Sequence, residues 1–235
     1  LLAGAALVSF LGWRASVRRS SELEQEAERL AREQRQLKSA HGQLKSQSEQ
    51  LKQMATNDPL TGVLNRQGFA GELRTALEHL ARFRRPLNLM LIDMDNFKQI
   101  NDRLGHLVGD QSLKMVVGVA REHLDSEHLF GRFGGDEFMI ACADESLEST
   151  AALAEAIRAA VVKAAAQHEP PLTGLSLSIG IAQASAETGY RSETLFHRAD
   201  TALYAAKHGG RNRVVLSDDT LPPPPVLEAA TRHLA

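Results

Sequence analysis

Two short apolar segments joined by a pair of glycines constrain this chain more than any other feature. Residues 129–133 and 137–142 lie on either side of Gly134-Gly135. A two-residue connection between strands is a tight hairpin, and glycine readily adopts the positive φ angles that such a turn requires. We therefore expect an antiparallel hairpin in the middle of the chain.

Other periodic segments surround this hairpin in an order that indicates the fold class. Their apolar residues recur either with helical spacing or with the two-residue alternation of strands. The expected helices include residues 73–80, 97–104, 110–123, 147–167 and 193–207, with breaks at Gly105 and Gly109, and the other expected strands are 87–93, 175–181 and 214–216. The central order β-α-β-β-α-β predicts an α+β domain with the ferredoxin-like plan.

Composition narrows the class of protein. The 235 residues allow one ordinary domain with accessory segments, and a hydrophobic content of 43% is typical of a globular chain. The formal net charge of −2 argues against a broad basic surface for nucleic acid. The single cysteine, Cys142, excludes an internal disulfide framework and a multi-cysteine zinc site, and its apolar neighbours predict a core position.

The N-terminal segment, residues 1–13, is uncharged and precedes Arg14, Arg18 and Arg19. An apolar run followed by clustered arginines is typical of the cytoplasmic end of a transmembrane helix. Thirteen residues rise only about 20 Å as a helix, less than the roughly 30 Å hydrocarbon core of a bilayer. Because the sequence starts with Leu1, we expect a fragment or processed chain that begins with the C-terminal stub of a span. A signal-peptide remnant or a buried helix is the alternative.

The next segment, residues 14–56, carries leucines seven residues apart, at Leu23, Leu30, Leu37, Leu44 and Leu51. With leucine at heptad position d, position a is mostly polar, at Ala27, Gln34, His41, Ser48 and Ala55. This pattern predicts a weak coiled coil, which Gly42 weakens further, and a single solvated helix is the alternative. We interpret the segment as a helical linker to a domain of residues 57–217, and residues 218–235 as a proline-rich tail.

Acidic residues gather where the first strand and the hairpin end. Asp93-Met94-Asp95 closes that strand, and Asp136 and Glu137 lie at the hairpin turn. The ferredoxin-like plan makes the strand and the hairpin neighbours, so Asp93 and Asp136 can converge. Oxygen ligands of this kind favour Mg²⁺, which binds through few carboxylates and substrate phosphates. An acidic surface turn that binds nothing is the alternative.

Polar side chains follow the first strand. Lys98 and Asn101 are three residues apart and share a helix face. Asp110 can accept two hydrogen bonds from the edge of guanine, and Asn101 can add a donor or an acceptor. Alternatively, Asp110 caps the following helix and Lys98 is solvated.

Two basic residues, Lys207 and Arg211, flank Gly209-Gly210 near the end of the last helix. They could hold the negative charge of a phosphate. The alternative is a glycine-terminated helix with basic residues in its last turn.

The motifs that contain these residues resemble those of the GGDEF family, the diguanylate cyclases. Residues 134–138 spell the family signature, and the other motifs are present in order. They are DPLTGVLNR at 58–66, DMDNFK at 93–98, IND at 100–102, GHLVGD at 105–110, LSIGIA at 177–182, ADTALYAAK at 199–207 and GRN at 210–212. The resemblance covers residues 54–217.

The resemblance implies that two GTP molecules condense to cyclic di-GMP and two pyrophosphates, with Mg²⁺, or alternatively Mn²⁺, as cofactor. The implied metal ligands are Asp93, Asp136, Glu137 and the Met94 carbonyl. The implied substrate-binding residues are Asn101 and Asp110 at guanine, Lys98 at phosphate, and Phe97, Gly134 and Gly135. The implied catalytic residues are Asp136, Glu137, Lys207 and Arg211, with Asp136 as the family's proposed proton acceptor.

The resemblance also implies partners and a location. One such domain binds one GTP and the product is symmetric, so two domains must face each other in a homodimer, held through the linker helix and the catalytic domains. We expect membrane attachment through the N-terminal span, at the inner membrane, with the catalytic domain in the bacterial cytoplasm. No nucleic acid partner is expected.

Other functions stay open beside this one. A degenerate domain could bind GTP or cyclic di-GMP as a regulator, although such members usually lose the signature acids that this chain keeps. A cyclase that makes cyclic GMP-AMP would carry a small hydroxyl residue in place of Asp110. An adenylyl cyclase shares the chemistry, but its motifs do not match.

One segment departs from the family pattern. Many members carry an Arg-x-x-Asp motif that ends five residues before the signature, where bound product inhibits synthesis. Here residues 125–128 read Asp-Ser-Glu-His, so an acid replaces the arginine and His128 replaces the aspartate. Because these acids repel phosphate and Arg132 alone is a weak replacement, we expect no product inhibition through this segment.

Overall fold

The structure is a computed structural model that describes residues 19, 29, 34–47 and 49–218. The chain divides into two units, residues 1–53 and residues 54–235. In the first unit, residues 34–47 and 49–53 are helical, as the heptad pattern predicts. The leucines of that helix are exposed, at 72% for Leu37, 70% for Leu44 and 67% for Leu51.

The expected membrane stub, residues 1–13, and residues 219–235 of the expected tail lie outside the described residues. Among the residues that are described, we find no helix with the length and apolar character needed to cross a membrane.

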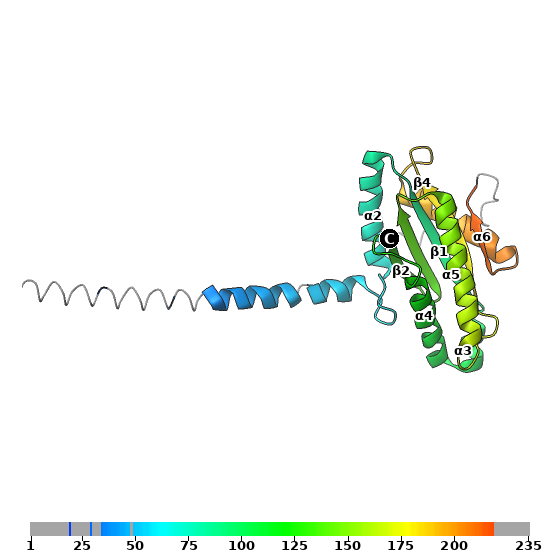
Figure 1. The fold of residues 1–235 in the computed structure, drawn as a ribbon, viewed down its shortest axis with the longest axis horizontal. Helices are drawn as coiled ribbons and strands as arrows, with labels where there is room; N and C mark the ends of the chain where they lie inside the picture. Colours follow the sequence, from blue (N-terminus) through cyan, green and yellow to red (C-terminus); the bar gives the residue numbers. More distant parts are fainter. Residues whose placement is uncertain (1–18, 20–28, 30–33, 48, 219–235) are drawn as a thin grey trace, which may run out of the picture. The chain divides into compact units, whose positions relative to one another are not determined.

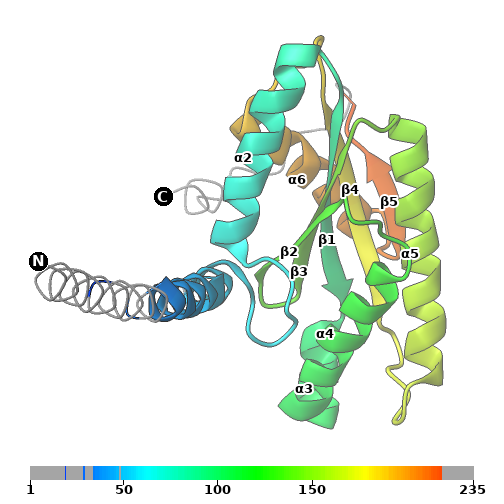
Figure 2. The same cartoon turned by 60° about the vertical axis from the view of Figure 1, so that its left-hand side comes forward.

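The second unit is built on a five-stranded sheet with the order β2-β3-β1-β4-β5 (Figures 1 and 2). The strands are β1 (Leu87–Asp95), β2 (Leu129–Gly134), β3 (Glu137–Ala143), β4 (Ser176–Ala184) and β5 (Arg213–Leu216). Strands β1 to β4 pair antiparallel, and β5 lies parallel to β4. The predicted ferredoxin-like order is confirmed, with one helix and one strand added after β4.

Helices cover both faces of this sheet (Figures 1 and 2). They are α2 (Arg66–Phe83), α3 (Phe97–Leu104), α4 (His106–Arg121), α5 (Leu147–Gln167) and α6 (Ser192–His208). One core lies between the sheet and α4 and α5, and the other lies between the sheet and α2 and α6. In β1, Met90, Ile92 and Met94 face the first core, whereas Leu87 and Leu89 face the second. Successive strand residues point to opposite faces, so this alternation fixes which β1 side chains approach α6.

Local capping explains why the predicted bounds of α5 are confirmed. The Ser146 hydroxyl accepts a hydrogen bond from the Ser149 amide at 3.0 Å. Serine is a favoured N-cap because its oxygen satisfies an amide that has no partner inside the helix. The cap therefore sets the start of α5 directly after β3.

Two details of the predicted fold were wrong. Helix α4 begins at His106, and Gly109 lies inside it instead of breaking it. The hairpin turn consists of Gly135 and Asp136, because Gly134 still pairs with Glu137. Only Gly135 of the two glycines has a positive φ, 51°.

Candidate active site

Three of the predicted acids meet at the end of the sheet where β1 runs into α3. Asp93 is the ladder partner of Glu137 on β3. The Met94 amide donates to the Asp136 carbonyl at 3.1 Å, which ties the hairpin turn to β1. The Asp93 carboxylate accepts a hydrogen bond from Lys207 Nζ at 2.6 Å. The structure thus brings together Asp93, Asp136, Glu137 and Lys207, of which the sequence predicted the convergence of Asp93 and Asp136.

Burial and mutual repulsion shape the charge of this acidic group. Burial raises the pKa of the Asp93 carboxyl, and the charges of Asp136 and Asp95 add to the increase against the opposing effect of Lys207. Burial also raises the pKa of Glu137, and the neighbouring charge of Asp93 is the next cause. Three carboxyl groups thus share the single nearby cation Lys207, and their oxygen donors fit a divalent cation such as Mg²⁺.

A buried carboxylate positions the turn that carries Arg211. The side chain of Asp95 is fully buried and accepts hydrogen bonds from Ser176 Oγ at 2.6 Å and Ser178 Oγ at 2.7 Å. It also accepts from the Asn212 amide at 3.0 Å. Arg211 and Asn212 have left-handed backbone angles, with φ of 62° and 47°. Non-glycine residues rarely adopt this conformation, so the bond to Asp95 helps to hold it.

The residues predicted to bind guanine (Asn101 and Asp110) and phosphate (Lys98) lie on α3 and α4. Lys98 and Asn101 are both on α3, as predicted, and Asp110 is inside α4 with Gly105 as the N-cap. The alternative that Asp110 caps α4 is therefore wrong. A Cβ atom on Gly109 would lie 1.9 Å from Asn101 Oδ1. Glycine at this position, directly before Asp110, therefore leaves room for the Asn101 side chain.

The remaining predicted substrate residues differ in their surroundings. Phe97 packs against the core on the α4 and α5 face. Gly134 and Gly135 have open space where a Cβ would be, with no atom within 4 Å. A ligand can therefore approach the backbone of the hairpin turn closely.

Arg132 connects the hairpin to the start of the domain, a role that sequence reasoning missed. Its Nη1 donates to both Asp58 carboxylate oxygens at 3.2 Å, and its Nε and Nη2 donate to the Gly135 carbonyl at 3.0 and 2.7 Å. Burial raises the pKa of Asp58, but hydrogen bonds from Thr61 and the charge of Arg132 outweigh this and hold it below its usual value. The only signal in the sequence was an acid in the motif at 58–66 and an arginine in the strand before the motif at 134–138.

A pocket of about 440 Å³ lies beside this connection. It is lined by Asp58, Asn65, Arg66, Gln67, Arg132, Phe133, Gly134 and Gly135. Of the predicted substrate residues it shares only the two glycines. The pocket therefore lies on the α2 side of the hairpin, separate from Asn101 and Asp110.

Comparisons with known proteins agree with this arrangement. A family model described as "Diguanylate cyclase, GGDEF domain" matches residues 55–213. Diguanylate cyclase DgcP of Pseudomonas aeruginosa is 38% identical over 162 residues, which cover 69% of this chain and 24% of that protein. Diguanylate cyclase DosC of Escherichia coli K12 is 41% identical over 162 residues, which cover 68% of this chain and 34% of that protein. The chain thus spans about a quarter to a third of the length of these curated relatives.

Solved structures give the same result. The coiled coil and GGDEF domain of DgcB from Caulobacter crescentus, in complex with c-di-GMP, superimposes with a TM-score of 0.70 at 31% identity. That match covers 76% of this chain and 94% of the solved chain. The diguanylate cyclase SiaD of Pseudomonas aeruginosa, in complex with its activator SiaC, gives a TM-score of 0.68 at 29% identity, covering 92% and 84%. By the match of residues 55–213 and by its relatives, this chain belongs to the GGDEF-domain family of diguanylate cyclases.

Proposed function

We propose that this chain is an active diguanylate cyclase that condenses two GTP molecules into cyclic di-GMP and two pyrophosphates. The observation that carries the proposal is the meeting of Asp93 and Glu137 across the β1–β3 ladder, with Lys207 at 2.6 Å from Asp93. A degenerate member would be expected to lack part of this acid set.

In the proposed reaction, the 3′-hydroxyl oxygen of one GTP attacks the α-phosphorus of the other. The bond from that phosphorus to the oxygen that bridges to the β-phosphate breaks, and pyrophosphate leaves. Asp136 accepts the hydroxyl proton, and Lys207 and Arg211 offset the negative charge that develops on the phosphates. Repeating the step in the other direction closes the ring.

Asp93, Glu137, Asp136 and the Met94 carbonyl are the proposed ligands of Mg²⁺, or of Mn²⁺ in its place. When bound, the ion would offset phosphate charge and orient the triphosphate. Lys98 and Phe97 contribute to the same substrate site from the start of α3. The open space at Gly134 and Gly135 supports close approach of the phosphates to the hairpin backbone.

We also propose that the active form is a homodimer. Leu37, Leu44 and Leu51 form an exposed apolar stripe with a seven-residue repeat on the linker helix. Pairing two such stripes would bury these leucines and bring two catalytic domains together. The position of the arginines after residues 1–13 supports the further proposal of attachment to the inner membrane, with the domain in the cytoplasm.

The direct test is to incubate the purified chain with GTP and Mg²⁺ and to identify the products by mass. We expect cyclic di-GMP and pyrophosphate, with a rate per molecule that rises with protein concentration. Binding of GTP or cyclic di-GMP by the folded chain without turnover would instead support a regulator. A full rate that is independent of concentration, from a chain that sediments as a monomer, would contradict the dimer.

Base selection can be tested at Asp110. We expect Asp110→Ser to lower the preference for GTP over ATP by roughly ten- to hundredfold. The reason is that the carboxylate matches the N1–H and amino donors of guanine, and a charge-assisted contact contributes about 1.5–3 kcal/mol. Competition assays with mixed nucleotides measure the product ratio.

Asp102→Ser is the matched control for this change, because Asp102 is an exposed aspartate on α3 next to Asn101. It should leave the product ratio unchanged. Equal ratios for the Asp110→Ser variant and the unmodified chain would remove Asp110 from guanine recognition.

A further inference from the structure

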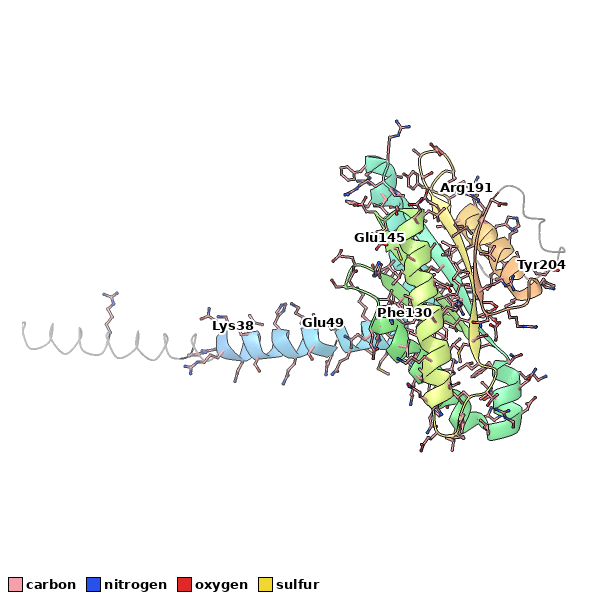
Figure 3. All side chains as sticks on the ribbon, turned by 45° about the vertical axis from the view of Figure 1, so that its right-hand side comes forward. Lys38, Glu49, Phe130, Glu145, Arg191 and Tyr204 are labelled. Carbon is pink, nitrogen blue, oxygen red and sulfur yellow. The ribbon has the colours of Figure 1, made fainter. Side chains whose placement is uncertain are left out.

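The turn that follows α6 holds Arg211, a proposed phosphate-binding residue, in an unfavourable backbone conformation. Helix α6, on which Tyr204 is labelled in Figure 3, ends at His208. Gly210, Arg211 and Asn212 follow with φ of 116°, 62° and 47°. Glycine adopts such angles freely, whereas Arg211 and Asn212 adopt them only at a cost in energy. Contacts from outside the turn are therefore needed to keep Arg211 where it is.

The first of these contacts comes from the sheet, through Asp95 at the end of β1. The Asp95 carboxylate accepts a hydrogen bond from the Asn212 amide at 3.0 Å. It is itself held by the hydroxyls of Ser176 and Ser178 on β4, at 2.6 and 2.7 Å. Hydrogen bonds to a charged acceptor are stronger than those to a neutral one, so this buried group is a firm anchor for the turn.

The second contact comes from α5, through Arg158. Its Nη1 donates to the side-chain oxygen of Asn212. Glu155, one turn earlier on α5, accepts from Arg158 Nε at 2.9 Å and also from Nη2, which orients the guanidinium. The Arg158 side chain is only 17% exposed. Asn212 is thus bound through its backbone to the sheet and through its side chain to α5.

Asp95 acts only through the turn, because it has no exposed surface with which to contact a ligand. Its side chain is fully buried, whereas that of Arg211 is 57% exposed. Arg211 Nε lies 4.0 Å from Asp95 Oδ1. Asp93, which accepts a hydrogen bond from Lys207, is two residues before Asp95 on the same face of β1, about 7 Å away. Two neighbouring carboxylates of β1 thus lie beside the two cations that we assign to phosphate.

We propose that Asp95 and Arg158 are positioning residues that place Arg211 for the binding of GTP phosphates. The inference rests on the proposed function, which assigns Arg211 to phosphate. Loss of either contact releases Asn212, and the turn can then return to right-handed backbone angles. The Arg211 guanidinium would leave its place beside the end of β1, so the affinity for GTP should fall although Arg211 is still present.

The test is calorimetric titration of the full chain with 3′-deoxy-GTP and Mg²⁺. This analogue keeps the triphosphate but lacks the hydroxyl that attacks in the proposed reaction, so binding is measured without turnover. We expect Arg211→Ala to weaken binding by about ten- to hundredfold, the effect of losing a charge-assisted hydrogen bond. Asp95→Ala and Arg158→Ala should each weaken it by at least about threefold, and by no more than Arg211→Ala. Thermal melting checks that each variant is folded.

Double variants separate positioning from a general structural role. Asp95→Ala or Arg158→Ala, combined with Arg211→Ala, should bind 3′-deoxy-GTP no more weakly than Arg211→Ala alone, because the position of the turn no longer matters without the guanidinium. Asp95→Asn should recover most of the affinity, since its amide oxygen can still accept from the Asn212 amide. If Asp95→Ala fails to fold, Arg158→Ala and its double variant decide the question.

Arg74→Ala is the matched control for Arg158→Ala. Arg74 is an exposed arginine on α2, and its loss should leave the affinity unchanged. Unchanged affinity in the folded positioning variants, or losses that add in full to that of Arg211→Ala, would overturn the positioning role. Normal binding by Arg211→Ala itself would instead remove Arg211 from the phosphate site, and the positioning role with it. Product formation from GTP is measured separately, so a failure of the cyclase activity is distinguishable from a failure of this inference.

Discussion

Replacing Asp93 by asparagine should abolish the proposed synthesis of cyclic di-GMP while the domain stays folded. The change removes a proposed metal ligand and the charge that faces Lys207, but keeps the shape of the side chain. Loss of at least about 4 kcal/mol of transition-state stabilisation corresponds to a rate roughly a thousandfold lower. Initial rates with GTP and Mg²⁺ measure the effect, and circular dichroism checks the fold.

The physical reason for expecting a stable variant is the repulsion within the acidic group. Burial, Asp136 and Asp95 all raise the pKa of the Asp93 carboxyl, so its charge is held in the folded state against a cost. A neutral asparagine removes that cost, and the partly exposed Lys207 can turn to solvent. Asp102→Asn on the exposed face of α3 is the control and should keep full activity. Near-normal turnover in Asp93→Asn would reject the assignment of Asp93.

The second large effect concerns stability, at Gly180 on β4. A Cβ atom there would lie 2.2 Å from the Leu203 amide nitrogen and 2.3 Å from the Ala199 carbonyl oxygen. Both are backbone atoms of α6, so the helix as a whole must move away from the sheet. Overpacking costs about 1–3 kcal/mol in general and more when the backbone is rigid, and we expect at least about 3 kcal/mol for Gly180→Ala. At roughly 2–4 °C per kcal/mol, the melting temperature should fall by about 6–12 °C.

Gly118→Ala is the matched control for this stability effect. Gly118 is an exposed residue inside α4, and a Cβ there meets no atom within 4 Å. Alanine is the better helix former, so this variant should be more stable by up to about 1 kcal/mol. Thermal melts of both variants make the comparison. Unchanged melting of Gly180→Ala would show that α6 does not depend on close approach to β4.

The sequence predicted those parts of the fold that depend on local pattern. Apolar periodicity gave α5 with its bounds, and the Ser146 cap explains why this worked. The strand pattern predicted the neighbouring positions of β1 and the hairpin, and hence the convergence of Asp93 with Asp136, whereas the direct ladder partner of Asp93 is Glu137. Gly109 was misinterpreted as a helix break. The structure shows that the close approach of Asn101 explains a glycine at this position, and such a tertiary contact cannot be read from sequence spacing.

Contacts between distant residues account for most of what remained hidden. Asp58 and Arg132 are 74 residues apart, and Asp95 and Asn212 are 117 residues apart. These polar residues belong to no pattern that identifies their partners, because the partners come together only when the sheet has formed. The inward position of His128 is of the same kind, because Glu145 and Cys142 approach it only after β2, β3 and the start of α5 have assembled.

The alternation of side chains along β1 links the packing of the hydrophobic core to the positions of two carboxylates. Met90, Ile92 and Met94 fill one core, while Asp93 and Asp95 point to the other side. A register slip of one residue would push both carboxylates into the apolar layer under α4 and α5 and turn the methionines toward α6. A chain in that register would bury two carboxylates among apolar side chains, so the misaligned fold would be unstable. Insertions in β1 should therefore yield unfolded protein rather than folded but inactive enzyme.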